Sequence, residues 1–161
     1  MTPLELALQT EVDGKAYYLK QAKTTDDVQL QKLFSMLADD EEKHYQIVSE
    51  MIKGQYRLME SNTLANVKTV FADKLAANET FQVEIDNIEA YEQAVKFEDD
   101  SIALYKDLAK SAKSSVEEEL FRELVREELR HRVILQNLLE AIRHPQSWVE
   151  DWEFNSKDDE Y

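Results

Sequence analysis

The chain has 161 residues, of which 43% are hydrophobic and 33% are charged, as expected for one globular domain with a charged surface. Its net charge of −15 argues against nucleic acids and anionic membranes as partners, because both carry negative charge. The lack of cysteine excludes disulfides, thiolate metal sites and thiol nucleophiles within these residues. No apolar run is long enough to cross a bilayer, and the N-terminal segment lacks the basic start of a signal peptide, so we expect a cytoplasmic protein.

Only two glycines and two prolines occur in the chain, which favours long helices over a turn-rich β structure. Hydrophobic residues recur at helical spacing in four long segments. A weaker pattern, "NTLANVKTVFADKLA", indicates a short helix inside a long connection. The long helices are predicted over about 3–23, 27–53, 84–112 and 116–143, and the short helix over about 62–76.

Local signals define several helix ends. Thr2 is a suitable N-cap for the first helix, since Pro3 at the first helical position has no N–H to leave unsatisfied. The second helix is expected to end near Gly54. Ser115 and Glu118 have the spacing of a capping box for the last helix.

We expect residues 1–143 to form the bundle and residues 144–161 to form an acidic tail. The tail carries Trp148, Trp152 and Phe154, and it is predicted to dock on the bundle or on a second subunit. His144, beside Pro145, is predicted to be a surface or tail contact.

The chain contains an internal repeat. "KLFSMLADDEEKHYQIV" aligns with "ELFRELVREELRHRVIL", and "TEVDGKAYYL" aligns with "FEDDSIALYK", always 87 residues apart (131 − 44). The chain is therefore two helix hairpins of one design. Short loops make the helices of each hairpin antiparallel neighbours, which predicts an all-α four-helix bundle with one long crossover.

Polar residues take core positions in every long helix. Each helix places one glutamate on its apolar stripe, and the second and fourth helices add a histidine three residues later. The six residues are Glu11, Glu41, His44, Glu98, Glu128 and His131.

Four ionised carboxylates in an apolar core require compensation, because burying each unpaired charge costs at least several kcal/mol. They could protonate, pair with Lys or Arg, or bind cations. The stripes carry no Lys or Arg at this level, whereas two divalent cations would neutralise four glutamates. One Glu from each of two helices and one Glu-x-x-His from each of the others is the di-iron or di-manganese carboxylate arrangement. A competing register is open, because Asp40 and Glu127 could pair with the histidines four residues on.

The chain resembles the ferritin-like superfamily, and within it the rubrerythrin-type proteins, over roughly residues 4–142. The resemblance rests on "EVDGKAYY", "DDEEKH", "FEDDSIALY" and "REELRH" in that order, with a similar ending, "HPQSWVEDWEF". It implies that all six residues are metal ligands, with Glu41 and Glu128 bridging two iron ions. Manganese or zinc would suit the same ligands.

Two departures from the rubrerythrin pattern stand out. Full-length rubrerythrins carry a rubredoxin-type iron site held by four cysteines, and this chain has none. They also carry a further glutamate one turn along the third helix, where this chain has Ser101, whose repeat mate is Gly14. The first departure implies an external electron donor, and the second implies a more symmetric site.

The predicted function is that of a di-iron oxidoreductase that reduces hydrogen peroxide or dioxygen, with metals roughly 3.5–4 Å apart. Tyr18 and Tyr105 could donate hydrogen bonds to ligands or bound oxygen species, or intercept a radical. We favour a structural role for both hydroxyls. The alternatives are iron storage with a ferroxidase step and purely structural metal ions. A homodimer is expected.

Overall fold

The computed structural model describes residues 1–145 except 58, 78 and 82, and the backbone of the described part is all-α. The predicted fold class is confirmed, and the predicted short helix is present. Five helices follow one another along the chain: α1 (Pro3–Thr24), α2 (Val28–Ile52), α3 (Thr63–Ala76), α4 (Ile85–Lys110) and α5 (Ser115–Arg143).

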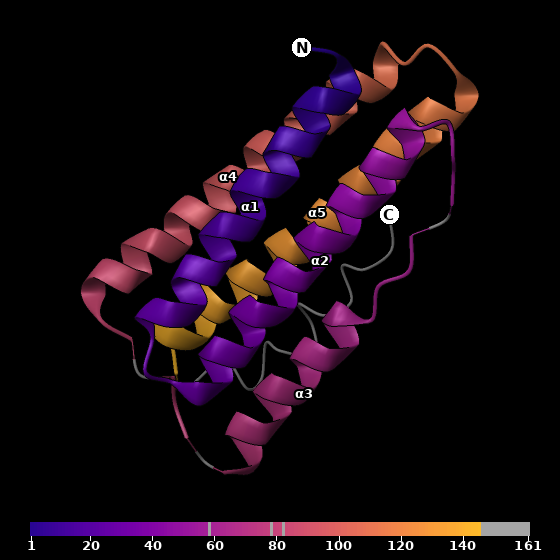
Figure 1. The fold of residues 1–161 in the computed structure, drawn as a ribbon. Helices are drawn as coiled ribbons and strands as arrows, with labels where there is room; N and C mark the ends of the chain where they lie inside the picture. The colour runs from indigo at the N-terminus through magenta and orange to yellow at the C-terminus, as the bar shows by residue number, and fades with distance from the viewer. Residues whose placement is uncertain (58, 78, 82, 146–161) are drawn as a thin grey trace.

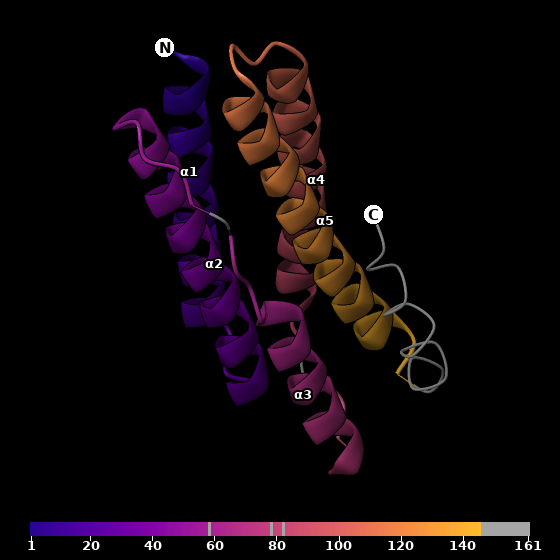
Figure 2. The ribbon, with the colours of Figure 1, turned by 90° about the vertical axis from the view of Figure 1, so that its right-hand side faces the viewer.

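Two antiparallel hairpins lie against each other. Figures 1 and 2 show α1 beside α2 and α4 beside α5, with α3 diverging at one end of the bundle. Three residues separate α1 from α2 and four separate α4 from α5, whereas the connection from α2 to α4 contains α3. The hairpins and the long crossover therefore follow the predicted order.

The helix ends confirm two of the three predicted signals. Thr2 caps α1 in a capping box with Glu5, and Gly54, just after α2, has a φ of +80° that suits glycine. The predicted box of Ser115 and Glu118 is wrong by one residue, because Ser114 is the N-cap of α5. Two serines followed by two glutamates fit both registers, so the sequence alone cannot separate them.

The apolar core consists of two clusters along the bundle. One contains Tyr18, Phe34 and Tyr91, and the other contains Tyr105 and Phe121. Along each long helix, the residues of one cluster and those of the other lie on opposite sides of the predicted ligand positions. The six polar residues therefore occupy a layer between two apolar layers.

A nearly buried ion pair anchors the crossover. The Lys74 Nζ atom of α3 lies 2.8 Å from the Asp27 Oδ2 atom, and Asp27 also caps α2 by accepting from the N–H groups of Gln29 and Leu30. One carboxylate thus joins α3 to the start of α2.

No helix in the described part of the chain combines the length and apolar character that crossing a membrane requires.

The N-cap of α5 gives a test of the observed register. Ser114→Ala removes the acceptor for the Glu117 N–H and should lower the free energy of unfolding by about 1 kcal/mol. Ser115→Ala is the matched control and should change stability much less, because Ser115 is the first helical residue rather than the cap. Chemical denaturation of both variants measures the difference. Equal effects would contradict the assigned register.

Candidate metal centre

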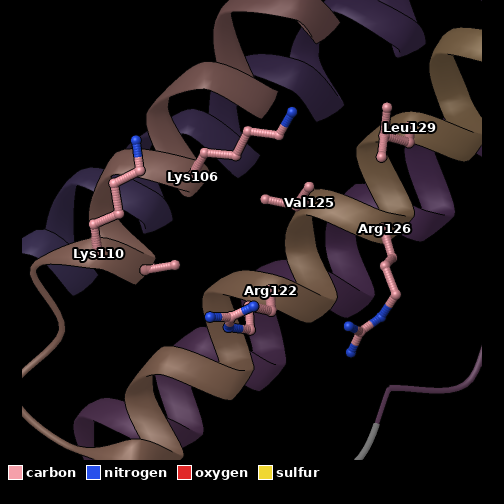
Figure 3. A pocket seen from close by; sticks show the side chains of 7 residues that line it. Lys106, Lys110, Arg122, Val125, Arg126 and Leu129 are labelled. Atoms are coloured by element: carbon pink, nitrogen blue, oxygen red, sulfur yellow. The ribbon is translucent and has the colours of Figure 1, made fainter. Parts of the chain in front are cut away.

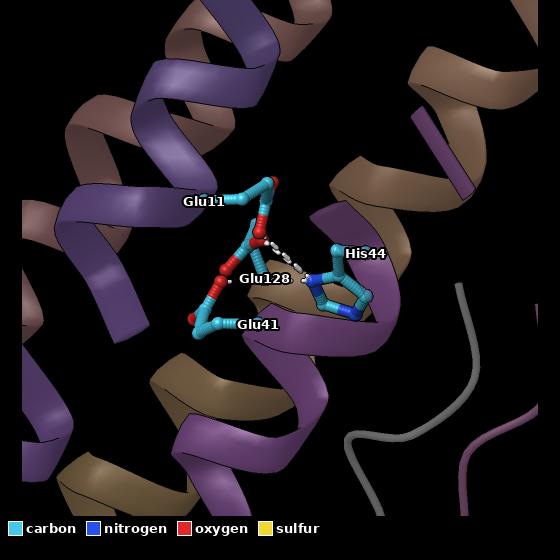
Figure 4. A group of neighbouring side chains, drawn as sticks. All are labelled: Glu11, Glu41, His44 and Glu128. Atoms are coloured by element: carbon cyan, nitrogen blue, oxygen red, sulfur yellow. Dashed lines mark hydrogen bonds and ion pairs between the residues drawn. The ribbon is translucent and has the colours of Figure 1, made fainter. Parts of the chain in front are cut away.

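The six predicted residues converge in one buried cluster. Each is at most 3% exposed. Their ligand atoms form two groups that share two glutamates, and within each group the atoms lie within 4.8 Å of one another. The first group is Glu11, Glu41, His44 and Glu128, and the second is Glu41, Glu98, Glu128 and His131. Figure 4 shows the side chains of the first group directed toward one another from α1, α2 and α5.

The inner nitrogen of His44 faces three carboxylates. Its Nδ1 atom lies 3.2 Å from Glu11 Oε2, 3.4 Å from Glu128 Oε1 and 3.7 Å from Glu41 Oε2. Because these helices come from both hairpins, the first group exists only in the assembled bundle.

The inner nitrogen of His131 has the matching environment. Its Nδ1 atom lies 3.2 Å from Glu41 Oε1, 3.4 Å from Glu128 Oε2 and 3.6 Å from Glu98 Oε1. Glu41 and Glu128 thus each direct one oxygen toward His44 and the other toward His131. This is the disposition that two bridging carboxylates would have.

The outer nitrogens of both histidines point to further carboxylates. His131 Nε2 lies 3.1 Å from Asp40 Oδ2, and His44 Nε2 lies 3.7 Å from Glu127 Oε2. The pairing within one helix that competed in the sequence is not the closest one, since each carboxylate contacts the histidine of the other hairpin. A carboxylate at Nε2 favours the tautomer that leaves the Nδ1 lone pair free for a cation.

The two tyrosines predicted at the site hydrogen-bond across the bundle. The Tyr18 hydroxyl donates to Glu98, and the Tyr105 hydroxyl donates to Glu11. Burial raises the pKa of both tyrosines well above its ordinary value, so both hydroxyls remain donors. Each tyrosine therefore holds the carboxylate contributed by the other hairpin.

The outer glutamates and the shared glutamates differ in ionisation. Burial, followed by neighbouring carboxylates, raises the pKa of Glu11 and Glu98 well above its usual value. Burial also opposes ionisation of Glu41 and Glu128, but close polar contacts within the cluster hold the pKa of Glu128 well below, and that of Glu41 below, the usual value. The two outer glutamates therefore resist ionisation more than the two shared glutamates do.

Burial alone would lower the pKa of the two histidines. The surrounding carboxylates, Glu11 for His44 and Asp40 for His131, instead raise the pKa of both imidazoles well above its ordinary value. At Asp40 burial acts against ionisation, yet the hydrogen bond to His131 lowers the pKa to about 2.

The ligand atoms fit cations better than they fit one another. Among the described residues, four buried ligand atoms have no aligned hydrogen-bond partner: Glu41 Oε1, Glu98 Oε2, Glu128 Oε2 and His131 Nδ1. Glu41 Oε1 and His131 Nδ1 are only 3.2 Å apart but are not aligned for a hydrogen bond. Carboxylate oxygens and imidazole nitrogens together suit Mn, Fe, Co or Zn.

Gly14 provides room for one shared carboxylate. A Cβ atom at this position would lie 3.1 Å from the Cδ atom of Glu41 and 3.2 and 3.3 Å from its oxygens. Glycine inside a helix costs about 1 kcal/mol relative to alanine, so its presence here is consistent with a need for space. The sequence identified Gly14 only as the repeat mate of Ser101 and did not reveal this contact.

A cavity of about 440 Å³ between α4 and α5 is a different kind of surface. It is lined by Lys106, Lys110, Arg122 and Arg126 around Ala109, Val125 and Leu129, as Figure 3 shows. It includes none of the six ligand candidates, and its cationic lining does not suit a metal cation.

His144, predicted to lie at the surface, has a side chain that is 61% exposed and lies 3.9 Å from Glu140.

Comparison with known proteins identifies the family. The rubrerythrin family model matches residues 3–139, and a second match covers residues 89–153. This chain belongs to the rubrerythrin family. The family lies within the ferritin-like superfamily, and its members bind metal ions, typically iron. No rubredoxin domain is found in this rubrerythrin-family chain, consistent with its lack of cysteine. Comparisons with curated proteins and with solved structures gave no match.

The raised pKa values predict how pH affects the metal-free protein. Glu11 and Glu98 bind protons more tightly in the folded state than at the ordinary pKa of 4.5, so stability falls as pH rises from about 4.5 through the raised values. Replacing both with Gln keeps the uncharged form and should reduce this decline, leaving the part that comes from the raised pKa values of His44 and His131. Thermal melts of metal-free protein between pH 5 and 9 test this, and an unchanged slope in the double variant would contradict it.

The close contact between Gly14 and Glu41 predicts that a larger residue at position 14 weakens metal binding. Gly14→Ala should displace Glu41 and weaken metal binding about tenfold, as changes beside metal ligands commonly do. Ser101→Ala, at the repeat mate, adds no atom and should bind normally. Isothermal titration calorimetry with Mn(II) measures the metal affinity of both variants. Unchanged affinity in Gly14→Ala would show that Glu41 does not need this space.

Proposed function

We propose that this chain is a redox di-iron protein that reduces hydrogen peroxide or dioxygen with electrons from an external donor. Two overlapping ligand groups that share Glu41 and Glu128 are the main support, because they would provide two metal positions in one buried layer of carboxylates and imidazoles. Membership of the rubrerythrin family supports iron as the metal. When bound, two ferrous ions would supply one electron each to an O–O bond.

The residues divide into ligands and positioning groups. Glu41 and Glu128 would bridge the metals, while Glu11 with His44 and Glu98 with His131 would complete the two halves. Tyr105 and Tyr18 would fix the outer glutamates by the hydrogen bonds already described. Both tyrosines are positioning residues in this proposal, as the sequence favoured.

Asp40 and Glu127 would keep the two imidazoles in the tautomer that binds metal. Both carboxylates also connect the buried site to polar groups nearer the surface. Asp40 accepts a hydrogen bond from Ser61 at 3.4 Å, and Glu127 accepts one from Arg130, whose side chain is 39% exposed.

The reaction consumes hydrogen peroxide, two electrons and two protons and produces two waters. After each turnover the electrons must be replaced from outside, since the 161 residues contain no cysteine for a rubredoxin-type site. An electron-donor protein is the proposed partner. The homodimer and the cytoplasmic location expected from the sequence stay predictions.

The function is tested by anaerobic iron loading. Two irons per chain by elemental analysis, followed by rapid near-ultraviolet changes on addition of peroxide, are expected for the native protein. Glu41→Ala and Glu128→Ala should slow this oxidation by more than about a hundredfold, because each removes a ligand shared by both metals. Asp39→Ala, an exposed acid on the same helix as Glu41, is the control and should react normally.

Two outcomes would replace the proposal. Tight zinc binding without any iron oxidation would make the ions structural. Rapid oxidation in an assembly of roughly two dozen chains that retains a mineral core would indicate storage instead.

A further inference from the structure

A second cavity, of about 300 Å³, lies between α1 and α2 and has Glu11 of the candidate metal centre among its lining residues. Glu11 is among its lining residues although this side chain is only 1% exposed. On its inner side the Glu11 carboxylate lies 3.2 Å from His44 Nδ1. One of the six ligand candidates therefore lies between this cavity and His44.

The walls of this cavity are apolar. Val12, Ala16, Leu19 and Tyr45 line it, and the exposed fractions of Val12 and Leu19 are 44% and 38%. The charged lining residues other than Glu11 form an ion pair between the two helices, with Lys15 Nζ 2.7 Å from Glu42 Oε2. Because Lys15 and Glu42 neutralise each other, the cavity suits an uncharged molecule better than an ion.

The repeat shows what occupies the equivalent place on the other hairpin. The mates of Val12 and Tyr45, each 87 residues later, are Asp99 and Arg132. These two form an ion pair between α4 and α5, with Arg132 Nε 2.5 Å from Asp99 Oδ1. Lys15 and Glu42 pair across α1 and α2, and their repeat mates are Ile102 and Leu129, so each hairpin has one such ion pair. The two hairpins differ at the position of Val12 and Tyr45, which is apolar beside Glu11 and charged beside Glu98.

We propose that the α1–α2 cavity admits and binds the oxidant, and that its substrates include small alkyl hydroperoxides. This inference rests on the proposed redox function. The cavity has about ten times the ~30 Å³ that one water occupies in the liquid, so it exceeds the needs of hydrogen peroxide. Its apolar walls favour an alkyl group, because removing apolar surface from water is favourable.

The proposed step balances. Breaking the O–O bond of the hydroperoxide with two electrons and two protons converts ROOH to ROH and water. When bound, two ferrous ions would supply one electron each, solvent would supply the protons, and the external donor would then restore the ferrous state. The alkyl group would lie against Val12, Ala16 and Leu19, with the hydroperoxide directed toward Glu11.

A matched pair of variants tests the route. Ala16 and Ala103 are repeat mates, both exposed, but only Ala16 is among the residues that line this cavity. In iron-loaded full-length protein, Ala16→Trp should slow oxidation by tert-butyl hydroperoxide at least tenfold, the usual scale for altered pocket contacts, and slow hydrogen peroxide less. Ala103→Trp should stay within about twofold of the native rate. Both variants should bind two irons.

A second measurement does not depend on turnover. Titration of redox-inactive, zinc-loaded protein with tert-butyl alcohol, an unreactive product analogue, should shift the backbone NMR signals of Val12, Ala16 and Leu19. The signal of Ala103 should not move. Ala16→Trp should abolish the shifts at the cavity.

The outcomes separate this inference from the proposed function. If the native iron site reacts with neither peroxide, the proposed function fails and this inference fails with it. If hydrogen peroxide reacts but the two tryptophan variants behave alike, only the assigned route is overturned. A native rate with tert-butyl hydroperoxide more than a hundredfold below that with hydrogen peroxide, together with no NMR shifts, overturns the substrate class.

Discussion

Burial of four carboxylates and two imidazoles in one layer of a helical bundle is the constraint on which the structure depends. Unpaired, these charges would cost far more than a domain of this size has in net stability. Charge balance can be reached in two ways. Without metal, the raised pKa values of Glu11, Glu98 and both histidines favour bound protons, which offset part of the negative charge. Two divalent cations would instead supply four positive charges and would occupy the unpaired ligand atoms.

The same layer joins the two hairpins. Tyr18 and Tyr105 each hold a glutamate of the opposite hairpin. Asp40 and Glu127 each face a histidine of the opposite hairpin. The apolar clusters on either side keep water away from the layer, so its electrostatic interactions act in a low dielectric. The positions of the ligand side chains therefore depend on how the two hairpins pack. Changes at the site should also alter that packing.

The helical periodicity of apolar residues in the sequence was enough to predict the four long helices, the hairpin order and all six ligand candidates. This worked because a charged residue on an otherwise apolar stripe is costly and therefore informative. The repeat then separated meaningful positions from the many surface acids. It did not predict the cross-hairpin partners of Asp40 and Glu127, because sequence spacing reports neighbours within one helix and not across the bundle.

Other features were also beyond the sequence. The space that Gly14 leaves for Glu41 depends on how closely α1 and α2 approach. The N-cap of α5 required coordinates, since Ser114 and Ser115 both precede a suitably spaced glutamate. The cavity beside Glu11 depends on how the side chains of α1 and α2 pack, which the sequence pattern does not report. The predicted docking of the tail lies outside the described residues and stays a prediction.

The central claim is that the layer binds two metal ions between Glu41 and Glu128. Anomalous diffraction at the iron edge from crystals grown and loaded with Fe(II) without oxygen would test it most directly. We predict two peaks per chain, one beside Glu11 and His44 and one beside Glu98 and His131, with both shared glutamates contacting each peak. A crystal soaked in excess Fe(II) that shows no anomalous peak in this layer, with the six side chains paired only to one another, would contradict the account.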